Sequence, residues 1–138
     1  MRTLLSGLTM FLFFTFSTYA QEIKFASNEI NYGKIDKGAN GERVFKFTNS
    51  GSAPLIIQEA KGSCGCTVPT YPKEPIMPGE SGEIKVKYDT QRVGAFTKYV
   101  TLTTNAVNET STRLTISGEV KAEEPAIVPA TPGVTPAK

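Results

Sequence analysis

Residues 80–105 have the sequence ESGEIKVKYDTQRVGAFTKYVTLTTN, and this stretch decides the fold. Apolar residues recur at alternate positions in both halves: Ile84, Val86 and Tyr88 in the first, and Phe96, Val100 and Leu102 in the second. Polar residues, mainly lysines and threonines, fill most of the positions between them. A period of two is typical of a strand with one buried and one solvated face. We therefore predict strands over residues 80–88 and 96–105, with a loop at 89–94.

Similar short segments occur through most of the chain. The further predicted strands are two pieces within residues 21–35, a strand at 42–49, a strand at 55–57 and a last strand at 113–120. Gly33 interrupts one of the first pieces and predicts a bulge, because a glycine inside a strand pattern often marks one. Asn49 to Ser52 form a turn signal, so we expect 42–49 and 55–57 to pair as a hairpin.

Residues 68–79 contain prolines at positions 69, 72, 75 and 78. Proline lacks an N–H donor, so this density excludes a helix or an interior strand and predicts an irregular connection. We expect Tyr71 and Ile76 to pin this connection to the core.

The pattern as a whole predicts an all-β protein: an Ig-like, antiparallel β-sandwich of about seven strands over residues 22–121. Strands with one apolar face bury it by packing two sheets together, and about 100 residues suffice for such a core. The chain has 138 residues, of which 39% are hydrophobic, which fits one globular domain. Lys and Arg total 15 against 13 Asp and Glu, with no basic cluster, so no nucleic-acid partner is expected.

Both ends of the chain differ from this domain. Residues 1–20 have one early arginine, an apolar run and small residues at Thr18 and Ala20, which predicts a signal peptide cut before Gln21. The uncharged run is short for a membrane span, so none is expected after cleavage. We expect the periplasm, the cell envelope or the extracellular space. Residues 122–138 are rich in proline and predict a disordered tail.

The two cysteines of the chain, Cys64 and Cys66, are two positions apart in the run SCGCT at 63–67. In an extended strand their Cα atoms would lie roughly 6.6 Å apart, near the upper limit for a disulfide. A bend at Gly65 would bring the sulfurs closer. A bridge over three residues stabilises by only about 1.6 kcal/mol in the chain-entropy estimate.

Three interpretations of this pair stay open. The cysteines are small buried residues of structural value, or they form a redox-labile disulfide, or they bind Cu(I) as thiolates. A closed zinc site needs four ligands, and the chain has no histidine. We expect no cofactor and no metal site apart from this weak Cu(I) candidate at Cys64 and Cys66.

Several of these runs together resemble one bacterial family. They are residues 45–51 (FKFTNSG), 54–57 (PLII), 63–67 (SCGCT), 75–79 (PIMPG), 94–96 (GAF), 104–105 (TN) and 116–120 (ISGEV). The chain is similar to the family of exported domains of unknown function marked by the SCGCT signature. That family is in turn similar to the Ig-like domains of major sperm protein and the Hydin type. The resemblance implies an Ig-like fold and an envelope location, and it supplies no catalytic residue.

The residue inventory favours a protein that binds over one that catalyses. Without histidine, hydrolytic triads of the Ser-His-Asp or Cys-His kind are excluded in their usual form. We therefore expect an exported binding or structural module of the envelope, not an enzyme, with another envelope protein or surface component as its partner. The alternative is a thiol-redox or Cu(I)-binding protein acting through Cys64 and Cys66.

Overall fold

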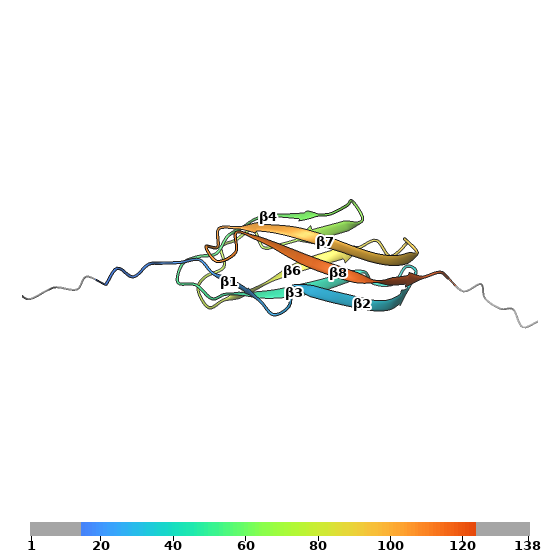
Figure 1. Ribbon diagram of the computed structural model, residues 1–138, viewed down its shortest axis with the longest axis horizontal. Helices are drawn as coiled ribbons and strands as arrows, with labels where there is room; N and C mark the ends of the chain where they lie inside the picture. Colours follow the sequence, from blue (N-terminus) through green and yellow to red (C-terminus); the bar gives the residue numbers. More distant parts are fainter. Residues whose placement is uncertain (1–14, 124–138) are drawn as a thin grey trace, which may run out of the picture.

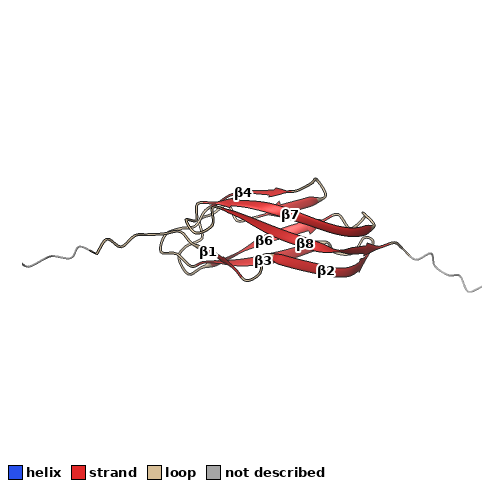
Figure 2. Cartoon of the chain, viewed as in Figure 1, coloured by secondary structure: helices blue, strands red, loops and turns tan. Residues whose placement is uncertain are grey.

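The computed structural model describes residues 15–123, and in this part of the chain every regular element is a strand (Figure 2). The strands are β1 (Ile23–Phe25), β2 (Glu29–Asp36), β3 (Glu42–Asn49), β4 (Ile57–Gly62), β5 (Thr67–Thr70), β6 (Ser81–Tyr88), β7 (Gly94–Thr104) and β8 (Ser111–Lys121). The described residues contain no helix long and apolar enough to cross a membrane.

The strands form two four-stranded sheets, in the orders β1-β3-β6-β5 and β2-β8-β7-β4. In Figure 1 the second sheet faces the viewer, with β4, β7, β8 and β2 from top to bottom. All pairs are antiparallel except β2 with β8, which run parallel. The predicted sandwich is confirmed, with eight described strands in place of about seven and one parallel pair.

The core lies between the sheets and follows the predicted alternation. On β3, Phe45 and Phe47 are each 1% exposed, whereas Lys46 between them faces solvent. On β6 and β7 the inward residues are likewise buried, among them Ile84, Val86, Val100 and Leu102. Burial of such side chains contributes about 1.5–3 kcal/mol each, which is why the register of these strands is fixed by their apolar faces.

The bulge predicted at Gly33 is present. The pairing of β2 with β8 shifts register between Asn31 and Lys34. Gly33 has a φ of +66°, in the left-handed region that glycine occupies without the steric cost of a Cβ.

The predicted hairpin between residues 42–49 and 55–57 is wrong. After β3 the chain crosses to the other sheet, where Ile57 opens β4 and pairs with Thr104 of β7. Leu55 forms an isolated bridge with Ile76 instead of lying in a strand. A turn signal marks a change of direction, but it does not specify whether the next strand joins the same sheet.

The proline-rich connection after the cysteines is partly regular. Its first residues belong to β5, which includes Pro69 and forms the outer strand of its sheet, so the exclusion of an interior strand holds. The predicted anchors are confirmed. Ile76 is 8% exposed, and Tyr71 packs against the core while its hydroxyl donates to the carbonyl of Gln58.

The described chain enters the sandwich at one end and leaves it at the other (Figure 1). At the entry end, the N–H of Ser52 donates to the carbonyl of Ala20 and that of Val107 to Gln21. At the exit end, the N–H of Lys37 donates to the carbonyl of Lys121. The predicted signal peptide lies mostly outside the described residues, as does nearly all of the predicted tail.

Candidate functional site

Three loops meet at the exit end of the sandwich, and we call this region the disulfide end. The loops are residues 37–41, 63–66 and 89–93. Backbone hydrogen bonds link them: Gly38 donates to Thr90, Tyr88 donates to Gly41, and Asp89 donates to Cys66 at 2.9 Å. The three loops are therefore hydrogen-bonded into one connected structure.

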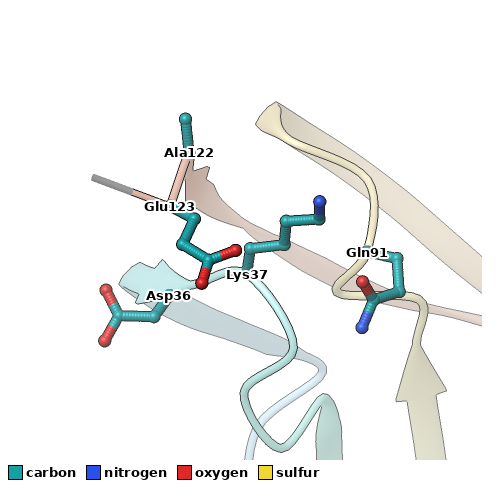
Figure 3. A pocket seen from close by; sticks show the side chains of 5 residues that line it. All are labelled: Asp36, Lys37, Gln91, Ala122 and Glu123. Atoms are coloured by element: carbon teal, nitrogen blue, oxygen red, sulfur yellow. The ribbon is translucent and has the colours of Figure 1, made fainter. Parts of the chain in front are cut away.

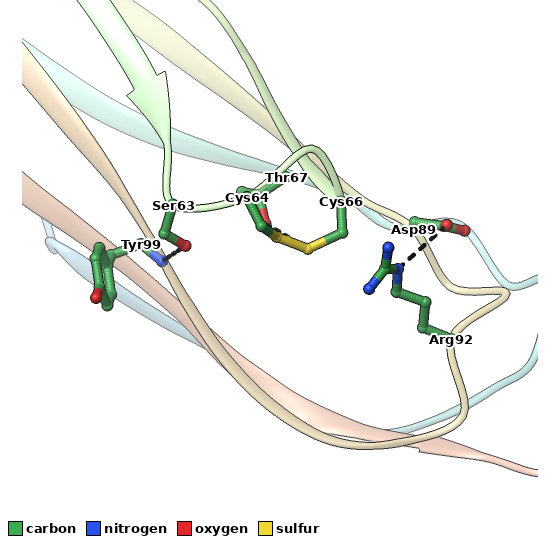
Figure 4. Close-up of a disulfide and its surroundings, with 7 residues drawn as sticks. All are labelled: Ser63, Cys64, Cys66, Thr67, Asp89, Arg92 and Tyr99. Carbon is green, nitrogen blue, oxygen red and sulfur yellow. Dashed lines mark hydrogen bonds and ion pairs between the residues drawn. A yellow bond between two sulfur atoms is a disulfide. The ribbon is translucent and has the colours of Figure 1, made fainter.

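Cys64 and Cys66 lie in the loop between β4 and β5, and their sulfurs are bonded to each other (Figure 4). Their Cα atoms are 5.3 Å apart, closer than the extended estimate. The difference arises because the segment is a turn and not an extended strand, as Gly65 allows. This separation falls within the usual range for a disulfide.

The two cysteines differ in burial. Cys66 is 4% exposed and belongs to the core cluster, whereas Cys64 is only partly buried and packs against that cluster from outside. Gly65 between them is exposed, with open space around it. The bridge therefore has an inner sulfur-bearing residue and an outer one.

Thr67 lies beneath the bridge. Its side-chain oxygen is 3.7 Å from Sγ of Cys64 and 3.7 Å from Sγ of Cys66, and the residue is 2% exposed. The backbone N–H of Thr67 also donates to the carbonyl of Cys64. A buried hydroxyl thus lies within contact distance of both sulfurs.

Hydrogen bonds from neighbouring strands fix both sides of the cysteine loop. The N–H of Ser63 donates to the carbonyl of Tyr99 at 2.8 Å, and the N–H of Tyr99 donates to Oγ of Ser63 at 3.2 Å. On the other side, Asp89 donates its N–H to Cys66 and forms an ion pair of 3.7 Å with Arg92 (Figure 4). Both charged side chains are about half exposed, so this ion pair contributes little to stability.

A hollow of about 490 Å³ lies beside these loops where the chain leaves the sandwich. Figure 3 shows its lining residues Asp36, Lys37, Gln91, Ala122 and Glu123. Small-molecule sites are mostly apolar and concave, whereas four of these five side chains are polar or charged. The hollow is therefore better described as solvated surface than as a ligand pocket.

The metal alternative gains no further ligands from the fold. Among residues 15–123, no group of three or more Cys, Asp or Glu side chains is placed to hold a metal ion. Cu(I) would need both thiolates, and in this structure the two sulfurs are bonded to each other. Cu(I) binding at Cys64 and Cys66 stays a prediction for the reduced protein.

The position of the cysteines was predictable from the sequence, but the roles of two polar residues were not: Thr67 beside the sulfurs, and Asn49 at the opposite end of the sandwich, where it pairs with Ile23. Thr67 is the last residue of the SCGCT run, yet its contact with both sulfurs depends on the turn geometry. Asn49 was predicted to end a strand and begin a turn, and it does both: β3 ends there, and Oδ1 accepts from the N–H of Gly51. Its complete burial, at 0% exposed, was not predicted. The available signal was its position, which continues the alternation of Phe45 and Phe47.

A family described as "Protein of unknown function (DUF1573)" matches residues 23–120, which covers the strands from β1 to the end of β8. The chain belongs to this DUF1573 family. The family assignment agrees with the resemblance to a family of unknown function, while the SCGCT run as its signature stays a prediction. No curated protein matches the chain.

Solved structures show the same fold. A protein of unknown function from Porphyromonas gingivalis W83 superposes with a TM-score of 0.67 at 17% identity, covering 78% of this chain and 51% of that one. The seventh PapD-like domain of human CEP192 superposes with a TM-score of 0.63 at 8% identity, covering 87% of this chain and 99% of that one. The periplasmic chaperone SfaE superposes with a TM-score of 0.54 at 9% identity, covering 75% of this chain and 60% of that one.

These likenesses confirm an Ig-like sandwich of the PapD-like kind. At these identities they show the fold alone. The chain spans about half the length of the Porphyromonas gingivalis protein that it resembles.

Proposed function

We propose that this DUF1573 protein is an exported module of the cell envelope that acts by binding another envelope protein, without catalysis of its own. The observation that carries this proposal is the placement of the disulfide end. It lies opposite the end where the N-terminal segment joins the sandwich, so that segment does not cover it, and the chain leaves the sandwich beside it (Figure 1). Two exposed apolar side chains, Val68 and Val93, accompany it.

The outer strands of both sheets favour loops over edges as the binding surface. β1 has three residues, β5 contains Pro69, β2 carries the bulge at Gly33, and β4 has a register shift near its start. Short strands, prolines and bulges are devices that oppose strand addition at a sheet edge. This favours recognition through loops, and we assign it to the connected loops of the disulfide end.

The envelope setting is supported by the predicted leader and by fold-level analogy with the periplasmic chaperone SfaE. The exposed valines support a protein partner, since protein interfaces carry apolar residues at their centre.

Site-specific photo-crosslinking in living cells tests the proposal. A photoreactive residue at Val93, which is 54% exposed, reports on the disulfide end, and one at Val107, 64% exposed, reports on the opposite end. We expect a discrete crosslink to an envelope protein from position 93 and none from position 107. No crosslink at position 93, or equal crosslinking at both positions, would contradict the proposal.

A further inference from the structure

The unequal burial of the two cysteines gives the bridge a direction. Cys66 is 4% exposed within the core, so a reagent from solvent does not reach it readily. Cys64 lies at the rim, next to the exposed and unobstructed Gly65. Thiol–disulfide exchange depends on which sulfur is accessible to the attacking thiolate. Attack is therefore favoured at Sγ of Cys64, and Cys66 becomes the leaving group.

The buried hydroxyl of Thr67 is placed to assist this departure. Its oxygen lies 3.7 Å from Sγ of Cys66, and a disulfide sulfur is only a weak acceptor. A thiolate released at Cys66 would be charged and would accept this O–H far more strongly. A hydrogen bond to the charged form lowers a pKa, and a leaving thiol of lower pKa departs faster.

Contacts other than the bridge also hold the cysteine loop in its shape. Ser63 and Tyr99 exchange two hydrogen bonds on one side, and Asp89 holds the carbonyl of Cys66 on the other. Gly62 lies so close to the carbonyl oxygen of Thr67 that a Cβ there would overlap it. The bond between Cys64 and Cys66 is therefore able to open and close while the sandwich stays folded.

From these contacts we propose that the Cys64–Cys66 bridge is a thiol–disulfide exchange site. A thiolate of a small thiol or of a dithiol protein attacks Sγ of Cys64, forming a mixed disulfide and releasing Cys66 as a thiolate. A second thiolate then attacks the reductant's sulfur and frees Cys64. The thiolates of Cys64 and Cys66 then take up protons, so the protein gains two electrons and two protons. The two thiols of the reductant are oxidised to a disulfide. This site stands independently of the binding partner proposed above.

Single-cysteine variants of the full chain test the direction of attack. In Cys66→Ser the remaining Cys64 should form a mixed disulfide with glutathione disulfide at least about tenfold faster than the remaining Cys66 does in Cys64→Ser, because burial restricts access to the inner thiol. The readout is intact mass over time, with circular dichroism to confirm folding. Equal rates, or a faster reaction at Cys66, would overturn the proposal.

Thr67 is a positioning residue, and its role has a separate readout. The pKa of Cys66 in Cys64→Ser is measured from the rate of alkylation against pH. It should be higher when Thr67→Val is combined with Cys64→Ser. With Thr67→Ser in place of Thr67→Val, the pKa should be close to that of Cys64→Ser alone. Reduction of the native bridge by glutathione should slow about tenfold in Thr67→Val, the size of one charge-assisted hydrogen bond. A pH profile of Cys66 alkylation that Thr67→Val leaves unchanged would overturn the proposal. So would a wild-type bridge that glutathione reduces only in denaturant, a result that does not depend on any variant folding.

Discussion

The side-chain amide of Asn49 donates a hydrogen bond to the carbonyl oxygen of Ile76 at 2.8 Å, from a position that is completely buried. The same amide nitrogen donates to the carbonyl of Ala53, and Oδ1 accepts from the N–H of Gly51. One side chain at the end of β3 thus connects the turn that follows it with the proline-rich segment before β6. It supplies the partners that these buried backbone groups need.

Replacing this residue should be costly. Asn49→Ala removes three hydrogen bonds. The Ala53 carbonyl and the Gly51 N–H lose this partner, whereas the Ile76 carbonyl keeps the N–H of Leu55. We expect a loss of about 3 kcal/mol in the free energy of unfolding. Urea denaturation followed by circular dichroism measures it. Lys85→Ala, on the solvated face of β6, is the matched control and should change stability by less than about 0.5 kcal/mol. A loss no larger than that of the control would show that water replaces the amide.

Two glycines of the cysteine loop offer a paired test of its packing. A Cβ on Gly62 would overlap the backbone carbonyl of Thr67, whereas one on Gly65 would meet nothing within 4 Å. We expect Gly62→Ala to cost about 2 kcal/mol, as overpacked sites do, and Gly65→Ala to be nearly neutral. Thermal unfolding of both oxidised proteins provides the comparison. Equal midpoints would mean that the loop relaxes freely around Gly62.

Tyr32 makes stability depend on alkaline pH. Burial raises the pKa of Tyr32 to about 12, although the nearby Arg43 acts in the opposite direction. Its hydroxyl donates to the carbonyl of Gly41 at 2.7 Å. Below pH 10 the phenol is neutral in both the folded and the unfolded state, so Tyr32 makes its full contribution to the free energy of unfolding. Between about pH 10 and 12 the unfolded state ionises first, so stability should fall by about 2 to 3 kcal/mol.

Tyr32→Phe provides the control for this dependence. Urea denaturation at several pH values should show that the variant loses the Tyr32-dependent part of the decline above pH 10. Below pH 9 it should be less stable by about 1 kcal/mol, since the Gly41 carbonyl loses one of its two donors and keeps the N–H of Tyr88. If wild type and variant decline in parallel above pH 10, Tyr32 is not the responsible group.

The ion pair between Lys121 and Asp36 should matter little despite its short distance of 3.1 Å. The two side chains are 52% and 83% exposed, and such pairs are screened by water and salt. We expect Asp36→Asn to change the free energy of unfolding by less than about 0.5 kcal/mol. Denaturation at low and high salt checks this, and a larger, salt-sensitive loss would contradict it.

The sequence allowed the strands to be predicted where one face is buried. On β3, β6 and β7 apolar residues such as Phe45 and Ile84 alternate with polar ones. Because exposing the apolar side chains to water is unfavourable, this alternation identifies both the strand and its buried face. The parallel pairing of β2 with β8 was not predictable in this way, because it joins Ile30 to Ile116 across most of the domain. Local periodicity contains no information about such distant partners.

The candidate site was predictable as a pair of residues but not as a geometry. Two cysteines around a glycine identified the position, and the turn at Gly65 determined that the Cα atoms would approach to 5.3 Å. The position of Thr67 under both sulfurs and the difference in burial between Cys64 and Cys66 depend on how β5 docks onto β6. Those are tertiary properties, so the direction of exchange was not available from the sequence.

We propose above all that this chain is exported and carries its bridge in the envelope. The most direct measurement is the intact mass of the protein, produced with its leader in a bacterium that has a periplasm. The protein is isolated from the envelope fraction without reductant and after alkylation. We expect a chain that begins at Gln21, carries no alkyl group and is lighter by two hydrogens than the dithiol form. A chain retained in the cytoplasm with residues 1–20 attached and both thiols alkylated would contradict it.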